Sequence, residues 1–247
     1  MVNKRRQFTT HINAGVLLTK VYRDIGEIMS SWEYKPNSIN VRKIIGDDGK
    51  EKIQIRVALG ILQMEVYGRP DGKTPNGEES LLDYYQSFFS EFGVPAEGFN
   101  PTEQDKKELD AEIMQYYHRR ICFFALKDYI LARRDAEHNI QLMDIISTYF
   151  GDKDYVQFHE QFRPFIIMEK TRAASLECLN NEDHAGAMMY IGDAIDIIEN
   201  FYRGYGIDED DIRKSPELML LRKWRAKIHQ DWEGGIAEID DFDVENE

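Results

Sequence analysis

Hydrophobic positions near the start of the chain recur first at helical spacing and then at every second residue. Between residues 12 and 32 they recur every three to five positions, which predicts an amphipathic helix that ends before Pro36. Apolar and polar residues then alternate on both sides of Asp47-Asp48-Gly49. Alternation predicts β-strands, and glycine tolerates the positive φ of a tight loop, so we predict an antiparallel hairpin. Its apolar residues are Ile39, Val41, Ile45, Ile53, Ile55, Val57 and Leu59.

A third extended segment is expected after Gly60, which interrupts the alternation and predicts a bulge or bend. The alternation then continues as far as Val66, so we expect a small antiparallel sheet. The sequence GRPDG at residues 68–72 has the composition of a turn, and helical spacing returns over residues 81–92. Residues 1–99 are therefore expected to form an N-terminal α+β part, in the order helix, antiparallel strands, helix.

From Thr102 onward the apolar spacing is helical almost to the end of the chain. Thr102 and Asp105 predict a capping box at the first of these helices. The breaks between the helices are short, so each helix must fold back against its neighbour. We therefore expect helical hairpins over residues 100–232 and an α+β, mainly α, fold. The breaks are expected at residues 127–128, 151–152, 180–183 and 204–206, with Pro164 and Ser215 at the starts of later helices.

A weak internal repeat relates two of these breaks. Placing Asp128 on Asp183 puts Ala132 on Ala187, where a small residue allows two helices to cross closely. The short turn followed by alanine resembles a tetratricopeptide helix pair, although the copies lie 55 residues apart and a tetratricopeptide unit has about 34. We expect tetratricopeptide-like hairpins, with an irregular helix bundle as the alternative. Stacked hairpins commonly bind a peptide or a partner helix in a groove.

Charge and composition exclude several classes of protein. The formal net charge is −14, and residues 233–247 hold seven acidic residues and no basic one, which predicts a disordered acidic tail. A dense basic cluster occurs only at residues 4–6, so direct binding to nucleic acid is not expected. Apolar runs are too short to cross a membrane, and the residues after position 6 are too polar for a signal peptide. Cys122 and Cys178 fit free thiols in a reducing compartment, so we expect a cytoplasmic protein.

The GRPDG turn continues into a sequence that is close to a phosphate-binding P-loop. Three residues instead of four separate the first glycine from Gly-Lys, and Pro75 removes an amide that the loop would use. We therefore expect a plain turn and no cofactor. Gln63, Arg69 and Asp71 remain candidates for a small-ligand or enzymatic site near this turn.

The other titratable residues do not suggest a catalytic centre. The six histidines are scattered, and only Asp135 and His138 share a helix face, which is half of a metal-binding motif. We expect a surface or capping role for His138, no metal site and no catalytic residue. On the last expected helix, Trp224 lies among four cations, which either contact acidic surfaces of the same chain or dock onto a partner. The cations are Arg222, Lys223, Arg225 and Lys227.

Residues 53–73, IQIRVALGILQMEVYGRPDGK, resemble a segment of uncharacterised bacterial proteins grouped with the UvrB/UvrC-motif-containing proteins. The segments FFALKDYILARRDAEHNI and SPELMLLRKWRAKI fit the same pattern, so the resemblance covers residues 41–228. Longer members end in a UvrB/UvrC-type helical hairpin that docks other proteins. The present sequence has no second helix for this hairpin after Ile228. The resemblance implies a bacterial protein but carries no established activity.

We expect a non-enzymatic adaptor or scaffold protein of the bacterial cytoplasm, which binds a protein partner through a helical-repeat groove. One alternative is a small-ligand-binding or enzymatic domain with its site near the GRPDG turn. Another is an accessory protein of nucleic-acid repair that acts through contacts with other proteins. The oligomeric state is not indicated. The candidate binding residues are Gln63, Arg69, Asp71, Arg133, His138 and Trp224.

Overall fold

Residues 24–92 and 101–234 are described by the computed structural model of the chain. Contacts divide the chain into two compact units, residues 1–33 and residues 34–247. The described part of the first unit contains the short helix α1 (Gly26–Ser31), which has no buried residue. This helix falls within the helix predicted over residues 12–32, and the earlier part of that prediction lies outside the described residues. The predicted boundary at residue 99 and the acidic tail from residue 235 onward also lie outside them.

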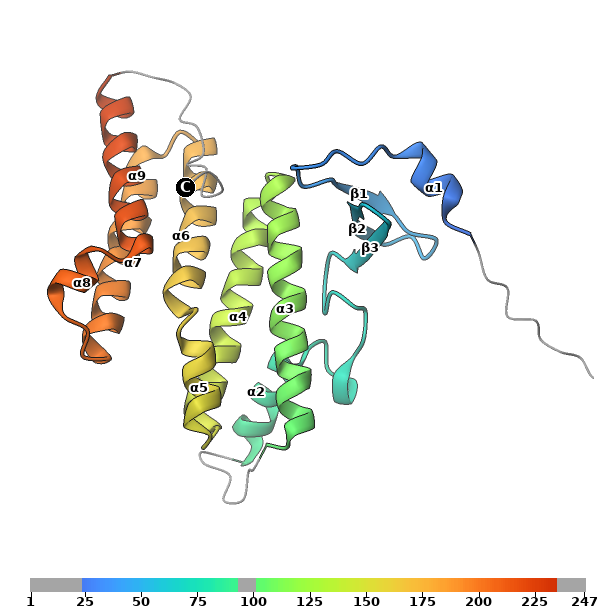
Figure 1. The fold of residues 1–247 in the computed structure, drawn as a ribbon, viewed down its shortest axis with the longest axis horizontal. Coiled ribbons are helices and arrows are strands. Elements are labelled where there is room, and N and C mark those ends of the chain that lie inside the picture. The colour runs from blue at the N-terminus through green and yellow to red at the C-terminus, as the bar shows by residue number, and fades with distance from the viewer. Residues whose placement is uncertain (1–23, 93–100, 235–247) are drawn as a thin grey trace, which may run out of the picture. The chain divides into compact units, whose positions relative to one another are not determined.

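A three-stranded antiparallel sheet opens the second unit (Figure 1). Gly49, in the loop after the first strand, has a φ of 75°, as the predicted hairpin requires. The strand register places Val41 opposite Ile55 and Ile55 opposite Leu62. The strands are β1 (Val41–Ile45), β2 (Glu51–Val57) and β3 (Gly60–Glu65), and they are neighbours in that order.

The turn between β2 and β3 differs from its prediction. Val57 lies opposite Gly60, so Ala58 and Leu59 form a two-residue turn and Gly60 begins the next strand instead of forming a bulge. Leu59 belongs to this turn and is 93% exposed, not a strand residue as predicted. The alternation of apolar residues continues past the end of β2 as far as Leu59, and this continuity conceals the strand end at Val57.

Helices make up most of the second unit, which confirms the α+β, mainly α, class. A 3-10 turn, η1 (Pro75–Gly77), precedes them. The helices are α2 (Leu81–Phe92), α3 (Glu103–Ala125), α4 (Tyr129–Tyr149), α5 (Lys153–Glu160), α6 (Arg163–Asn180), α7 (His184–Gly204), α8 (Glu209–Arg213) and α9 (Pro216–Glu233).

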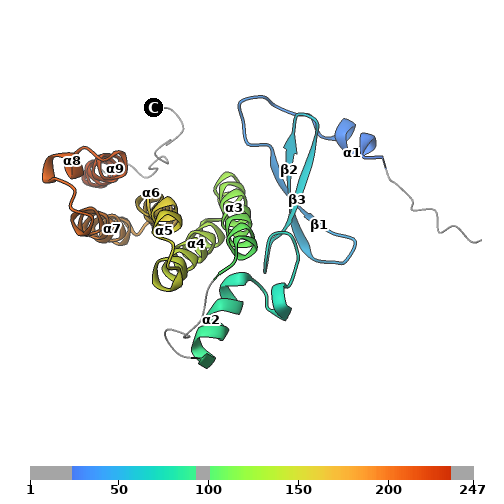
Figure 2. The same cartoon turned by 60° about the horizontal axis from the view of Figure 1, so that its bottom comes forward.

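The long helices form a row in which each packs against the next. The most extensive contacts join α3 to α4, α4 to α6, α6 to α7 and α7 to α9. Viewed along their axes, α3, α6 and α9 lie on one side of the row and α4 and α7 on the other (Figure 2). The sheet lies beside α3, where Ile53 and Val66 pack with Cys122 and Phe123. Two hollows lie where this zigzag separates α4 from α7 and α3 from α6.

Local sequence signals explain the ends of several helices. Thr102 and Asp105 form a capping box at the start of α3. The capping box predicted from the sequence is therefore confirmed. Pro164 lies in the first turn of α6, where its missing N–H group needs no partner. Asp152 accepts hydrogen bonds from the first N–H groups of α5, a helix that the sequence analysis did not predict.

The turns after α3 and α6, which the sequence repeat relates to each other, have the same geometry. Lys127 and Glu182 have φ values of 56° and 60°. The N–H of Asp128 donates to the carbonyl of Phe123 at 2.8 Å, and the N–H of Asp183 donates to that of Cys178 at 2.9 Å. Equivalent residues Ala132 and Ala187 are both fully buried. The repeat exceeds a tetratricopeptide unit because α4 is long and α5 extends α6.

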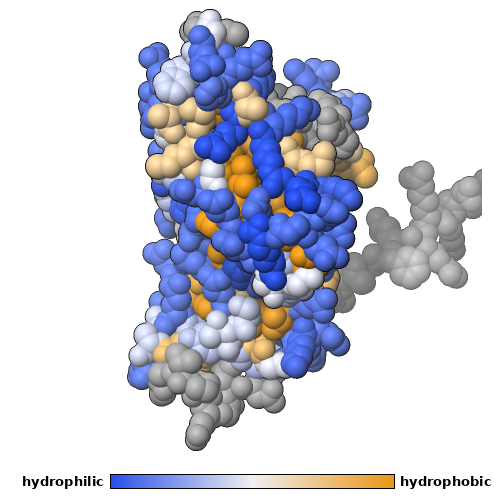
Figure 3. Space-filling view, turned by 90° about the vertical axis from the view of Figure 1, so that its left-hand side faces the viewer, coloured by the Kyte–Doolittle hydropathy of each residue, from blue (hydrophilic) through white to orange (hydrophobic). Residues whose placement is uncertain are grey.

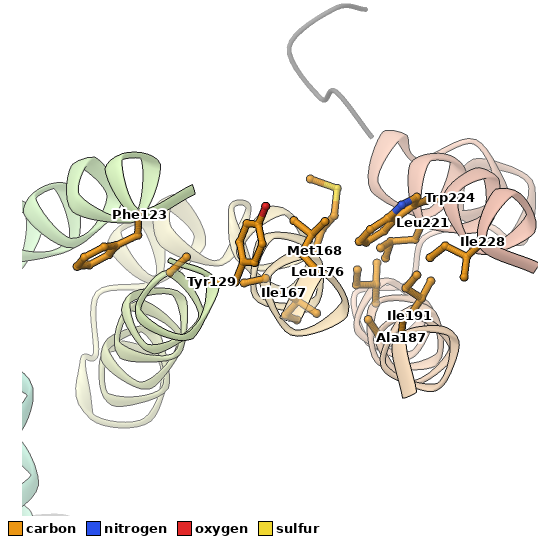
Figure 4. Packing of buried hydrophobic residues seen from close by; sticks show 14 of the residues in the cluster. Phe123, Tyr129, Ile167, Met168, Leu176, Ala187, Ile191, Leu221, Trp224 and Ile228 are labelled. Atoms are coloured by element: carbon orange, nitrogen blue, oxygen red, sulfur yellow. The ribbon is translucent and has the colours of Figure 1, made fainter. Parts of the chain in front are cut away.

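The largest hydrophobic cluster follows the row of helices, so the interfaces share one continuous core (Figure 4). Dehydration of these side chains is the main term that holds successive helices together. The members of the cluster labelled in Figure 4 are Phe123 on α3, Tyr129 on α4, Ile167, Met168 and Leu176 on α6, Ala187 and Ile191 on α7, and Leu221, Trp224 and Ile228 on α9.

Candidate functional site

Charged side chains are buried where the segment after β3 and the start of α2 meet α3 and α4. We name them the buried polar cluster. Opposite charges in a protein interior must be paired and hydrogen-bonded, so their contacts decide whether they serve structure or chemistry. The members of the cluster are Arg69, Glu112, Arg119, Asp135 and His138.

Glu112 of this cluster caps the start of α2. Its two carboxylate oxygens accept hydrogen bonds from the backbone N–H of Leu81 at 3.0 and 2.9 Å, and Oε1 also accepts one from Leu82 at 3.3 Å. The first N–H groups of a helix lack partners in the helix and attract an anion. His138 Nε2 lies 3.0 Å from Oε1, and Arg69 Nε lies 3.5 Å from Oε2. Both oxygens therefore already have partners within the chain.

Arg119 and Asp135 form a bidentate pair between α3 and α4. Arg119 Nε donates to Oδ2 of Asp135 at 2.7 Å, and Nη2 donates to Oδ1 at 2.8 Å. The remaining nitrogen of Arg119, Nη1, donates to the carbonyls of Glu65 at 3.0 Å and Gly68 at 2.7 Å. The pair thus ties the chain after β3 to two helices.

An aromatic stack completes the cluster. The ring of Tyr116 lies parallel to that of His138, with 3.4 Å between their centroids. The Tyr116 hydroxyl donates to the carbonyl of Gly68 at 3.4 Å. Burial raises the pKa of Tyr116, so its hydroxyl stays protonated and can keep donating. These contacts fix the position of the GRPDG turn, so they stabilise the fold.

The structure brings together three of the four candidate residues in this region. Arg69 Nε lies 3.1 Å from Asp71 Oδ1 and also reaches the carboxylate that His138 contacts. Gln63 is exposed on β3, where it accepts a hydrogen bond from Gln54 at 2.9 Å. The expected surface position of His138 is wrong, because it is buried and bonds the capping carboxylate of α2.

A groove on the α4 and α7 side of the row contains another candidate residue, Arg133. We name it the central groove; it has a volume of about 740 Å³ and is lined by α4, α6, α7 and Leu82. Arg133, Arg134 and Lys170 line it together with a single carboxylate, that of Glu137. The groove also contains partly exposed apolar side chains, including Ile130 and Tyr190. Its chemistry suits an apolar chain segment with acidic side chains.

The last candidate residue, Trp224, is a core residue. It is only 3% exposed and packs with α6 and α7 in the main hydrophobic cluster. Trp232 is the exposed tryptophan of α9, and its ring stacks parallel to His184. The predicted contact between the α9 cations and acidic groups of the same chain is confirmed for Arg222, which donates to Glu199 at 2.6 Å.

A larger hollow of about 940 Å³ lies between α7 and α9. Figure 3 shows this end of the molecule, where hydrophilic side chains cover most of the face and hydrophobic ones appear in narrow strips between them. Arg222 and Arg225 line the hollow together with Asp193 and Asp196. Because these charges balance, the hollow has less preference for a charged partner than the central groove.

Sequence reasoning missed Glu112, Arg119 and Arg120, which are all buried on α3. The signal was present, because Leu109, Glu112, Tyr116, Arg119 and Phe123 recur at intervals of three and four residues. Charged residues on an apolar face indicate buried ion pairs.

Two further findings concern metals and membranes. In residues 24–92 and 101–234, no group of three or more histidine, cysteine, aspartate or glutamate residues is placed to hold a metal ion. No helix in the described part of the chain combines the length and the apolar character needed to cross a membrane. Cys122 is a buried free thiol, and burial raises its pKa to about 12.

Comparison with known proteins finds no matching family model, no matching curated protein and no matching solved structure. The resemblance to UvrB/UvrC-motif-containing proteins therefore stays an expectation.

Proposed function

We propose that this chain is a non-enzymatic binding protein of the bacterial cytoplasm. In this proposal the central groove holds an acidic, amphipathic segment of a protein partner. The observation that carries the proposal is the lining of the groove, in which Arg133, Arg134 and Lys170 accompany one carboxylate in a chain with a net charge of −14. Cations that line a groove of an acidic protein favour a partner of opposite charge.

The ion pairs of Arg133 and Lys170 leave these two cations of the groove available to a partner. Arg133 Nη1 lies 3.6 Å from Glu177, and Lys170 pairs with Glu137. These four side chains are partly exposed, and exposed pairs contribute only about 0–1 kcal/mol. A partner carboxylate can therefore replace a carboxylate of the chain at little cost. Burial of Ile130 and Tyr190 would supply the hydrophobic part of the affinity.

The buried polar cluster supports a binding role over an enzymatic one. Glu112, Arg119 and Asp135 are occupied by hydrogen bonds that hold the fold together. A catalytic group must instead be free to reach a reacting atom. The free thiols of Cys122 and Cys178 support a reducing compartment such as the cytoplasm.

Selection from a phage-displayed library of random 16-residue peptides on the immobilised full chain tests this proposal. We expect enrichment of peptides that combine apolar residues at helical spacing with aspartate and glutamate. The variant Arg133→Glu/Lys170→Glu should bind the selected peptides at least tenfold more weakly in fluorescence anisotropy. The loss of affinity in this variant, relative to the original chain, should be smaller at high salt, because salt screens exposed charges.

The matched control reverses two exposed charges away from the groove, in the variant Arg213→Glu/Arg225→Glu. This control should bind the selected peptides within about twofold of the original chain, apart from a small long-range effect of net charge. Enrichment of basic peptides, no enrichment, or equal losses in the two variants would each reject the proposal.

A further inference from the structure

An apolar pocket lies on the opposite face of α4 from the central groove. It has a volume of about 620 Å³ and is lined by α3, α4 and the junction between α5 and α6. We name it the Arg120 pocket. Its size falls in the range of about 300–1,000 Å³ that is common for small-ligand sites.

The walls of this pocket are large hydrophobic side chains that the chain leaves uncovered. Phe158 is 54% exposed and Phe162 is 47% exposed, and their rings meet edge to face. Met114 is also exposed, and Met143 and Phe165 continue the wall inward. Methionine and phenylalanine adapt to ligands of irregular shape.

A buried arginine with free donors reaches the same pocket. Arg120 is 1% exposed, and its Nε and Nη1 have no hydrogen-bond partner among the described residues. The nearest carboxylate oxygen, on Glu169, is 3.9 Å from Nε, and the ring of Tyr117 lies 5.4 Å from the guanidinium carbon. A buried donor without a partner is unfavourable. The adjacent Arg119 is also buried but fully hydrogen-bonded, because its three nitrogens all donate to a carboxylate or to backbone carbonyls.

Asn139 presents an unused acceptor in the pocket. Its Nδ2 donates to the carbonyl of Ile113 at 3.1 Å, and its buried Oδ1 has no hydrogen-bond partner in the described part of the chain. Since Nδ2 is committed to a carbonyl, the orientation of the amide is fixed. The pocket therefore offers donors from Arg120 and an acceptor from Asn139.

The buried His159 and the partly exposed Asp110 also line the pocket. His159 Nε2 lies 3.0 Å from Oδ1 of Asp110, which also accepts a hydrogen bond from Tyr155 at 2.8 Å. Burial lowers the pKa of His159, which opposes a positive charge there. Asp110 repels an anion, so the acidic end of a ligand is favoured at Arg120.

We propose that the Arg120 pocket binds a small carboxylic acid with an apolar body. The carboxylate accepts hydrogen bonds from Nε and Nη1 of Arg120, and the apolar body lies among Phe158, Phe162 and Met114. A hydroxyl group on the carbon next to the carboxylate donates to Oδ1 of Asn139. The ligand thus supplies partners for the buried polar atoms and covers the exposed rings.

Calorimetric titration of the full chain with matched aromatic ligands tests the charge requirement. 3-Phenylpropionate should bind at least tenfold more tightly than 3-phenylpropanol, which has the same body without the charge. 3-Phenyllactate, which adds the hydroxyl group, should bind more tightly than 3-phenylpropionate. Equal affinity for the acid and the alcohol, or no binding of either acid, would overturn the proposal.

Methyl NMR on methionine-labelled protein locates the bound acid. The methyl signals of Met114 and Met143 should shift on addition of 3-phenyllactate, whereas that of Met219 on α9 should not. Shifts confined to methionines outside the pocket would reject the assigned site.

Two variants separate binding from folding. Arg120→Met removes the charge but keeps the length of the side chain, and should abolish the preference for the acid over the alcohol. Phe158→Ser alters an exposed wall residue and should weaken both ligands at least threefold with little effect on the circular dichroism spectrum. Arg213→Met on α8 is the matched control and should leave affinity unchanged. Retention of the acid preference in a folded Arg120→Met protein, or unchanged affinity in Phe158→Ser, would contradict the proposal.

Binding of the acid does not require the cations of the central groove. Arg133→Glu/Lys170→Glu should still bind 3-phenyllactate, because both residues lie outside the Arg120 pocket.

Discussion

Two adjacent arginines on α3 show how much the surroundings of one residue decide its role. Arg119 is bonded to a carboxylate and two carbonyls, so its charge is compensated inside the fold. Arg120 is equally buried but has donors without acceptors, and burial lowers its pKa. The first arginine stabilises the native contacts, whereas the second is a source of binding affinity for an anion.

At the scale of residues, the sequence predicted some members of the buried cluster but not their partners. Arg69, Asp71 and His138 were candidates because of their turn or helix context. Glu112 and Arg119 were not, because helical spacing alone does not show which charged residue will find an opposite charge on another segment. That pairing depends on the crossing of α3 and α4, which is a tertiary property.

Glu112→Gln tests the capping role of this glutamate. Both oxygens of Glu112 accept from the N–H of Leu81, so the NH2 group of glutamine would oppose a donor. We expect the free energy of unfolding to fall by about 1–3 kcal/mol. Urea denaturation followed by circular dichroism measures the change.

Glu108→Gln is the control, since Glu108 lies on the exposed side of the same helix. Its effect should stay within about 0.5 kcal/mol. Equal effects of the two substitutions would contradict the capping role.

At the scale of elements, local signals predicted helix ends better than helix identity. The capping box at Thr102 and the start of α6 at Pro164 depend on nearby residues and could be read from sequence. Helix α5 was missed because its eight residues are too few for a clear period. The exposed turn residue Leu59 was assigned to a strand because its apolar character matched the alternation.

At one position in each of the turns after α3 and α6, we expect glycine to give a more stable protein than the native residue. Lys127 and Glu182 adopt a positive φ, which is unfavourable for residues with a side chain. Lys127→Gly and Glu182→Gly should each raise the free energy of unfolding by about 0.5–1 kcal/mol, measured by urea denaturation.

Asn181→Gly provides the comparison, because Asn181 precedes Glu182 with a φ of −100°. Glycine should give no gain there, since it adds freedom to the unfolded chain and removes the hydrogen bond from Nδ2 of Asn181 to the carbonyl of Glu177. Stabilisation by Asn181→Gly but not by Glu182→Gly would show that backbone strain is not the cause.

At the scale of the whole second unit, each helix of the row depends on its immediate neighbours. The last helix, α9, covers α7 with Leu218, Leu221, Trp224 and Ile228. In a row of this kind stability is close to a sum of interfaces between neighbours. The final interface therefore protects the apolar face of α7 from water.

Trp224→Ala tests this terminal interface. Removal of a buried tryptophan should lower the free energy of unfolding by about 3–5 kcal/mol, because it loses hydrophobic contacts and leaves a cavity. Trp232→Ala, at a tryptophan that is 48% exposed, should cost less than about 1 kcal/mol. Thermal and urea unfolding of both variants measure the difference, and similar losses would contradict the buried position of Trp224.

Helix α4 forms a wall of both the central groove and the Arg120 pocket. Arg133 and Glu137 line the central groove, and Asn139 and Met143 line the Arg120 pocket. Because the two sites share this helix, a ligand that tilts or rotates α4 at one site also reshapes the other. Affinities linked in this way change reciprocally and by the same factor. A single helix would then be sufficient to transmit a chemical signal from one face of the protein to the other.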